Sequence, residues 1–246
     1  MPALRSRLIL AAILLMGASA AASAHSYLAV PAAGAVTVIP DIGASRAAYR
    51  ELTSPDQVDI YEFTARAGQE IYIQMTVPFL DRESGFAPDF VLLSADANAA
   101  PFDPPILARA SLVDPPHDVV DRVHEHGVGG EPPSVGAAYG GGEPLVFDEP
   151  FTGTRYWIRQ TITVPAPADG TYRIGVYSAN GSLGKYVLAP GKAEKFTVGD
   201  ILGLPGVRMK VREFCEQPVW PDIVFWSVLG LAALAGAGFG IYALLG

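Results

Sequence analysis

The chain has 246 residues, of which 50% are hydrophobic and 17% are charged, and its formal net charge at pH 7 is -8. This balance excludes a disordered polyelectrolyte and a nucleic-acid-binding protein with a basic face, and it disfavours acidic partners. We therefore expect no nucleic-acid partner.

The first 24 residues have the order of a secretory signal peptide. Two arginines precede an apolar run, and small residues follow it up to Ala24. This order predicts a cleaved leader over 1–24 with an A-x-A site, which leaves His25 first. A cut after Ala20 also fits. We expect an exported protein whose folded part lies on the periplasmic or extracellular side.

Residues 25–212 alternate apolar and polar side chains with period two. The stretch "EIYIQMTV" places apolar side chains on one face, and with "VDIYEFTA" and the turn at Ala67-Gly68 it predicts a hairpin. Further strands are expected in "DFVLLSA", "TRYWIRQTITV", "GTYRIGVYS", "GKYVLA" and "EKFTV", with another hairpin turn at Asn180-Gly181. About eight short strands predict one antiparallel sandwich, an all-β fold.

Two stretches resemble the pre-peptidase C-terminal family of jelly-roll domains: "SPDQVDIYEFTARAGQEIYIQM" and "PADGTYRIGVYSANGSLGKYVLAPG". The matching positions are Asp59, Tyr61, Phe63, Ala67, Gly68, Gly170, Thr171, Tyr172, Gly184, Tyr186 and Leu188. The resemblance covers about a quarter of the chain. It implies an accessory, non-catalytic module with a jelly-roll-like sandwich. This chain departs from the family pattern by a long insertion and by lacking a protease domain.

The insertion spans about residues 96–153 and is rich in proline and glycine, so regular strands and helices are not expected through most of it. It holds three of the four histidines. If 123–127 is extended, His124 and His126 project from one face, with His117 near enough to join them. A solvated loop that binds nothing is the other interpretation.

A metal site would use imidazole, which suits copper or zinc. Its predicted ligands are His25, His117, His124 and His126. If the leader is cut after Ala24, His25 offers both its imidazole and a free amine, an arrangement similar to the copper brace of exported copper proteins.

Other chemistry is sparse. Asp148 and Glu149 could act as acid and base, but nothing in the sequence places them in a cleft. Trp157, between Arg155 and Arg159, is either a contact anchor or buried beneath the insertion. The alternation puts Tyr156, Ile158, Ile162 and Val164 on one face and Trp157 on the other.

The C-terminal stretch predicts a juxtamembrane linker over 213–222 and a transmembrane helix over 223–246, because about two dozen residues pass without a charge. The lone Cys215 lies in this linker, as a free thiol or in an intermolecular disulfide. Ala232, Gly236 and Gly240 recur every four residues and form a possible helix-pairing face. The expected partners are the membrane and, through this helix, a second copy or another membrane protein.

Two functions remain open from sequence. The first is a membrane-anchored extracytoplasmic sandwich that acts as a binding or assembly module with an unidentified ligand. The alternative is an exported copper- or zinc-binding protein or metalloenzyme that uses the histidine-rich loop. Because no nucleophile or phosphate-binding motif is present in its usual pattern, we predict binding rather than catalysis.

Overall fold

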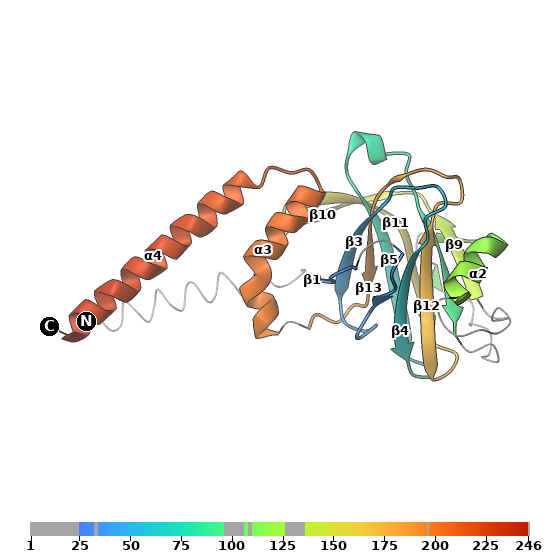
Figure 1. The fold of residues 1–246 in the computed structure, drawn as a ribbon, viewed down its shortest axis with the longest axis horizontal. Helices are drawn as coiled ribbons and strands as arrows, with labels where there is room; N and C mark the ends of the chain where they lie inside the picture. Colours follow the sequence, from blue (N-terminus) through green and yellow to red (C-terminus); the bar gives the residue numbers. More distant parts are fainter. Residues whose placement is uncertain are drawn as a thin grey trace.

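The computed structural model describes residues 25–31, 34–95, 106–107, 110–125, 136–195 and 197–245. These residues form a β-sandwich of two sheets, with one long helix projecting from it (Figure 1). The sandwich part of the predicted fold class is therefore confirmed.

The larger sheet, which we call sheet I, has the strand order β1-β3-β13-β5-β11-β10, and β7 also pairs with β11. Its strands are β1 (Ser26–Tyr27), β3 (Arg46–Leu52), β5 (Glu70–Pro78), β7 (Ile106–Leu107), β10 (Leu145–Glu149), β11 (Thr154–Pro165) and β13 (Gly184–Pro190). Sheet II has the order β2-β4-β12-β6-β9-β8. Its strands are β2 (Thr37–Val38), β4 (Asp59–Ala65), β6 (Asp89–Ser94), β8 (Ala110–Val113), β9 (Gly136–Gly141) and β12 (Gly170–Tyr177).

The sheets are mixed rather than purely antiparallel, which corrects the predicted class. β1 runs parallel to β3, and β2 runs parallel to β4. The strands β1 and β2 have two residues each. No alternation pattern that short indicates a direction.

Both predicted hairpins are wrong. β4 pairs in sheet II, whereas β5 pairs in sheet I, so the turn at Gly68 (φ 75°) carries the chain from one layer to the other. The turn at Gly181 (φ 73°) does the same between β12 and β13. Alternation reports which face of a strand is buried, and both sheets bury a face in the same core, so it does not identify the sheet.

The main core confirms the predicted buried face of β5. Ile71, Ile73, Met75 and Val77 are all fully buried between the sheets. From sheet II, β4, β6, β9 and β12 contribute aromatic side chains to the same cluster, namely Tyr61, Phe63, Phe90, Tyr139 and Tyr172. The alternation in these strands therefore predicted the core better than it predicted strand pairing.

The described helices are η1 (Asp81–Glu83), α2 (His117–Glu125), α3 (Val198–Phe214) and α4 (Trp220–Leu245). A capping box of Thr197 and Asp200 starts α3. α3 packs on the outer face of sheet I, where Val211 joins Tyr156 and Val187 in a separate apolar cluster. The sequence pattern did not predict α3, since it contains Pro205 and has little amphipathic character.

Regular structure within residues 96–153 also corrects the expectation of a structureless insertion. β8 and β9 extend sheet II, β10 forms an edge of sheet I, and α2 covers sheet II on the side away from α3 (Figure 1). Proline and glycine lie mostly between these elements, so the average composition of the segment did not indicate the strands and the helix.

The predicted transmembrane helix over 223–246 is wrong. Within the described ranges, no helix combines the length and the apolar character needed to cross a membrane. The start of α4 is a polar junction: Asp222 is buried and pairs with Arg208 and Arg212 of α3. The Arg212 contact, at 2.9 Å, is an ion pair without hydrogen-bond geometry. The prediction counted uncharged residues from 223 onward and so left out Asp222, which pairs the start of α4 with α3. The last residue of the predicted span, Gly246, lies outside the described residues.

Candidate functional site

The structure does not bring the predicted metal ligands together. His25 precedes β1 on the α3 side of the sandwich, whereas His117 and His124 belong to α2 on the opposite side (Figure 1). His126 lies outside the described residues. Within the described ranges, no group of three or more His, Cys, Asp or Glu side chains could hold a metal ion. Copper or zinc binding stays a prediction.

The histidine-rich segment is helical up to Glu125 rather than extended. Val119 and Val123 are four residues apart on α2, and both are buried against Ile60 and Val91 of sheet II. The Arg173 guanidinium donates to the carbonyl oxygens of Val123 and His124. The main chain at His124 is therefore used to dock the helix.

His25 lines a pocket between the sandwich and α3. The pocket is small, with a cavity volume of about 20 Å³, which is room for about one water molecule. Its walls include a carboxylate, three aromatic rings and an apolar side chain from α3, namely Glu149, Tyr27, Tyr49, Phe151 and Val211. The His25 Nδ1 lies 2.5 Å from Ser45 Oγ. Burial lowers the pKa of His25, while the charges of Glu149 and Glu194 act in the opposite direction.

Glu149 ends β10 and closes the turn that leads to β11. It is 8% exposed. Its Oε1 accepts from the Phe151 amide at 3.0 Å, and its Oε2 accepts from the Thr152 amide at 2.6 Å and from the Thr152 hydroxyl. The neighbouring Asp148 is exposed and pairs with Arg155. The two carboxylates therefore have different surroundings and do not form an acid–base pair.

A buried polar chain links this turn to α3. The Thr152 and Thr154 hydroxyls are 2.6 Å apart, and Thr154 Oγ1 lies 2.9 Å from the Tyr156 hydroxyl, to which Cys215 Sγ donates at 3.2 Å. Cys215 is the C-cap of α3 and is buried, so it does not belong to an exposed linker. Burial raises the pKa of its thiol to about 11. A sulfur held in this way is not available to a second chain.

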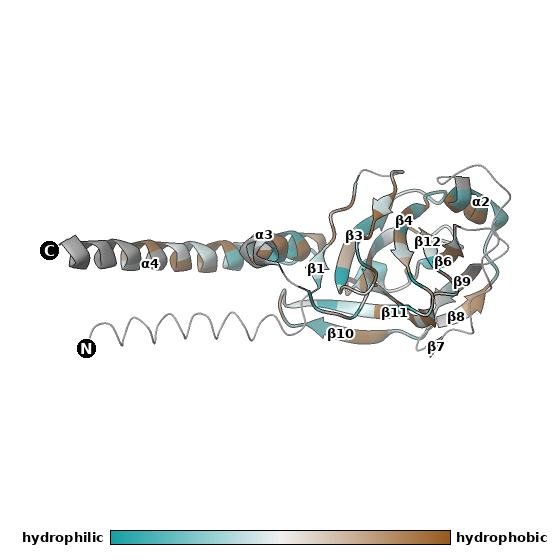
Figure 2. Ribbon diagram, turned by 90° about the horizontal axis from the view of Figure 1, so that it is seen from below, coloured by the Kyte–Doolittle hydropathy of each residue, from teal (hydrophilic) through white to brown (hydrophobic). Residues whose placement is uncertain are grey.

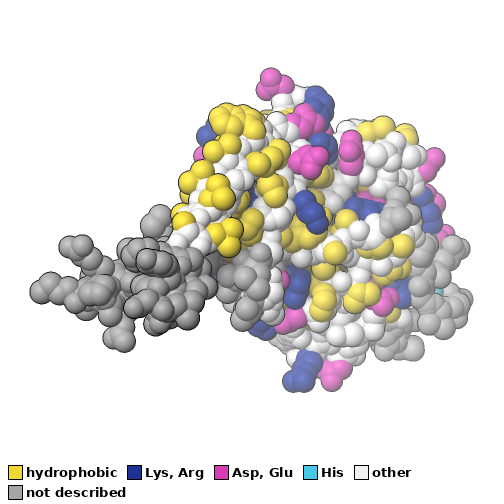
Figure 3. Space-filling model, turned by 60° about the vertical axis from the view of Figure 1, so that its left-hand side comes forward, with side chains coloured by type: hydrophobic (Ala, Val, Ile, Leu, Met, Phe, Trp, Pro, Cys, Tyr) yellow, Lys and Arg dark blue, Asp and Glu magenta, His cyan; other side chains and the backbone are white. Residues whose placement is uncertain are grey.

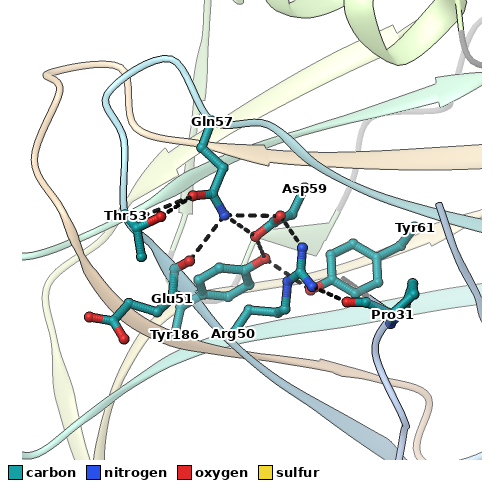
Figure 4. Close-up of polar contacts among 8 residues, drawn as sticks. All are labelled: Pro31, Arg50, Glu51, Thr53, Gln57, Asp59, Tyr61 and Tyr186. Atoms are coloured by element: carbon teal, nitrogen blue, oxygen red, sulfur yellow. Dashed lines mark hydrogen bonds and ion pairs between the residues drawn. The ribbon is translucent and has the colours of Figure 1, made fainter. Parts of the chain in front are cut away.

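Three of the residues that carry the family resemblance, Asp59, Tyr61 and Tyr186, form a second polar cluster with Arg50 and Gln57, inside the sandwich (Figure 4). Asp59 is 2% exposed and pairs with Arg50. The Tyr186 hydroxyl donates to Asp59 at 2.7 Å, the Tyr61 hydroxyl lies 2.9 Å from Tyr186, and the Gln57 amide donates to both Asp59 oxygens at 3.1 Å. Burial raises the pKa of Tyr61 and Tyr186. This cluster ties β3, β4 and β13 together and is structural.

Trp157 lies on the core side of sheet I. The sequence pattern had assigned this face to Tyr156, Ile158, Ile162 and Val164. A β-bulge between Ile158 and Gln160 shifts the register of β11. Tyr156 therefore faces α3, while Ile162 and Trp157 face the main core. Trp157 is half-buried, lies 4.5 Å from the Phe79 ring centroid and has the Arg159 guanidinium 5.3 Å above it. The residues before the bulge therefore face the opposite side from the predicted one, whereas Ile162, after the bulge, faces the core as predicted.

α4 carries exposed apolar side chains (Figure 3). Between 37% and 72% of the surface of each is accessible in Ile223, Val224, Phe225, Val228, Leu229, Leu231 and Leu234. Ala232, Gly236 and Gly240 all lie on this helix, and nothing comes within 4 Å of a Cβ placed on Gly236. The helix extends away from the sandwich in both ribbon views (Figures 1 and 2).

Sequence reasoning missed Glu149 as a pocket residue and missed α3 altogether. The sequence indicates for Glu149 only an acid–base role with Asp148. Glu149 stands two and three residues before the amides from which it accepts hydrogen bonds. This short spacing is the local feature of the sequence that could have indicated its role in the turn.

The sequence matches no protein-family model. It also matches no curated protein. Among solved structures, the pre-peptidase C-terminal domain of a Bacillus anthracis collagenase is 16% identical, with a TM-score of 0.32, 65% of this chain covered and 97% of that domain. The predicted resemblance to this type of domain is confirmed as a weak and partial one.

Two further structures have similar scores. PliG of Salmonella Typhimurium, a periplasmic inhibitor of g-type lysozyme, is 13% identical with a TM-score of 0.30, and the match covers 64% of this chain and 98% of PliG. CorA, a surface-associated copper-binding protein of Methylomicrobium album BG8, is 9% identical with a TM-score of 0.27, covering 63% of this chain and 96% of CorA. At these values none of the three likenesses says what this protein binds.

Proposed function

We propose that this protein is an exported assembly module, in which the β-sandwich is the folded body and α4 is the element that contacts its partner. The observation that carries the proposal is the exposed apolar surface of α4. An apolar surface of this kind on a soluble protein marks a contact surface, because leaving it in water is unfavourable. Export is supported by the leader pattern of residues 1–24, which lie outside the described residues.

The partner that fits best is this chain itself, in a homo-oligomer. The exposed apolar side chains of α4 occupy more than one face of the helix, so several apolar helices are needed to cover them. The positions 232, 236 and 240 lie four apart and carry small side chains, which allows two helices to approach closely. Copies of α4 supply both features at once. The membrane is not part of this proposal, since the span on which it rested is wrong.

The junction with α3 gives α4 a defined direction. Arg208 and Arg212 both pair with Asp222, and Arg212 also donates to the carbonyl oxygens of Thr152, at 2.8 Å, and Pro218. The contacts of Arg212 join α4 to the β10–β11 turn of the sandwich. A fixed direction lowers the entropy cost of assembly, because the helix is already placed when the partner arrives.

The test is the mass of the purified full chain, measured by light scattering after size exclusion, for wild type and for the Leu231→Glu/Leu234→Glu variant. We expect a discrete oligomer for wild type and a monomer for the variant, because two buried, unpaired carboxylates oppose helix packing. Val38→Glu is the matched control, because Val38 is an exposed apolar residue of β2, and we expect this variant to keep the wild-type mass.

A monomeric wild type at all concentrations, or an unchanged mass in the double variant, would show that α4 is not a self-association element. Polydisperse aggregates in place of a discrete mass would also count against the proposal.

A further inference from the structure

Arg159 of β11 is a buried cation without a counter-charge. The residue is 5% exposed, and among the described residues no carboxylate oxygen lies within 4.0 Å of its guanidinium. Arg173, the other arginine buried to this degree, is 7% exposed and pairs with Glu62 at 2.9 Å. Burial lowers the pKa of Arg159, and no neighbouring negative charge opposes this shift. A cation buried in this way is unfavourable unless an anion pairs with it.

Part of the Arg159 guanidinium also has no hydrogen-bond partner. Its Nη2 donates to the carbonyl oxygens of Glu83, at 3.3 Å, and Ser84, at 2.7 Å. In the part of the chain that the structure describes, Nε and Nη1 make no hydrogen bond. Protein atoms enclose Nε, whereas Nη1 is not enclosed. Nη1 is therefore the donor that a ligand can reach.

Aromatic rings lie beside this donor and are open to solvent. The Arg159 guanidinium is 5.3 Å from the centroid of the Trp157 ring, and the Trp157 and Phe79 rings are 4.5 Å apart. Phe79 is 38% exposed, and Val146, the partner of Trp157 across β10 and β11, is 46% exposed. An apolar group can therefore lie against these side chains while a polar atom bonded to it meets Nη1.

The carboxylates on the neighbouring segments are already used. Glu83 accepts from the Lys185 amide at 3.3 Å, and Asp148 accepts from both Nε and Nη2 of Arg155. Neither pairs with Arg159. A carboxylate from outside the chain would supply the missing counter-charge, and its planar shape suits a guanidinium.

We propose that Arg159 binds a carboxylate carried by a small apolar group: the carboxylate accepts from Nη1, and the apolar group packs against Trp157 and Phe79. The carboxylate belongs either to a free organic acid or to the C-terminal residue of a peptide.

The test is a titration of the full chain followed through the indole NMR signal of Trp157, whose ring the Arg159 guanidinium faces. The chain has three tryptophans, and the signal that is lost in Trp157→Phe assigns this one. The probes are sodium benzoate, its neutral analogue benzamide, and N-acetyl-glycyl-phenylalanine with a free carboxylate, all at the same ionic strength in sodium chloride. We expect no shift with benzamide and saturable shifts with benzoate, with a Kd on the order of 1–10 mM, as suits a ligand of about nine heavy atoms. Binding of the blocked dipeptide as well would identify a peptide C-terminus as an accepted source, whereas binding of benzoate alone would identify a free acid.

Arg159→Gln should weaken benzoate binding at least tenfold. The control is the double variant Asp148→Asn/Arg155→Gln, which removes an exposed ion pair without changing the net charge and should leave the Kd within twofold. Because Arg159 also holds two carbonyl oxygens of a neighbouring turn, Phe79→Leu provides a second variant that keeps the guanidinium, and we expect it to weaken binding about threefold. Equal shifts with benzamide, no saturable shift in wild type, or an unchanged Kd in Arg159→Gln would each overturn the proposal. These outcomes are independent of the mass measured for α4 variants.

Discussion

Asp59 shows how strongly one buried residue holds the sandwich together. It is 2% exposed and is the counter-charge of Arg50, which is also largely buried. We predict that Asp59→Asn lowers the free energy of unfolding by about 3–5 kcal/mol, because the guanidinium of Arg50 is then buried without a charge partner. Urea unfolding at pH 7 measures this change.

The control for this prediction is Asp148→Asn, which breaks an exposed pair with Arg155. We expect a loss of about 0–1 kcal/mol there, since exposed ion pairs contribute little. Similar losses in the two variants would mean that burial of the Asp59 pair does not determine its contribution.

The reactivity of Cys215 follows from its place at the end of α3. Burial raises the pKa of its thiol to about 11, and only a thiolate reacts rapidly with disulfide reagents. We predict that an aromatic disulfide reagent at pH 8 labels the native protein at least a hundredfold more slowly than the protein unfolded in urea. Fast labelling of the native chain, or a disulfide-linked dimer on a non-reducing gel, would contradict the buried position.

At the scale of elements, the docking of α2 depends on a glycine in β12. A Cβ on Gly175 would lie 2.3 Å from Val123 Cγ2 and 3.2 Å from Val91 Cγ1. We predict that Gly175→Ala destabilises the protein by about 1–3 kcal/mol, through overpacking beneath the helix, and speeds amide exchange in residues 117–125. Hydrogen exchange followed by mass spectrometry resolves this segment.

Gly170→Ala in the same strand is the matched control, because nothing lies within 4 Å of its added Cβ. It should leave exchange in 117–125 at the wild-type rate. If Gly175→Ala behaves in the same way, α2 is not held by close packing on β12.

The alternation of side chains predicted the buried faces of the strands but not the sheet to which each strand belongs. The faces of β4 and β5 followed from alternation, since each has one side in the core. Their assignment to different sheets did not, because the turn at Gly68 continues the chain equally well into either layer. α3 was not predicted because it contains Pro205 and has little amphipathic character, and the face of Trp157 was not predicted because a bulge leaves no trace in the pattern.

Close approach of two α4 helices gives a further prediction at this scale. We expect Gly236→Leu to weaken self-association about tenfold or more, because its side chain would separate the helices at positions 232, 236 and 240. Gly230→Leu is the control, since it also has nothing within 4 Å but lies on another face of the helix. Sedimentation equilibrium compares the two, and equal weakening would mean that the small-residue face has no special part in assembly.

The response of the whole molecule to acid depends in part on His25. Burial lowers its pKa below the ordinary value of 6.5, so between these two values the unfolded chain binds more protons than the folded chain. Stability must therefore fall as the pH falls below about 6.5, by at most about 1.4 kcal/mol per pH unit for one group. Glu83 and Asp89 have pKa values raised by burial and act in the opposite direction in their own range.

The difference in stability between wild type and His25→Gln isolates the contribution of the histidine, because both chains share those carboxyls. We predict that wild type loses more stability than His25→Gln between pH 7 and pH 5 in urea unfolding. Parallel curves would mean that His25 titrates alike in the folded and unfolded chain, and that the pocket beneath α3 does not shield it from water.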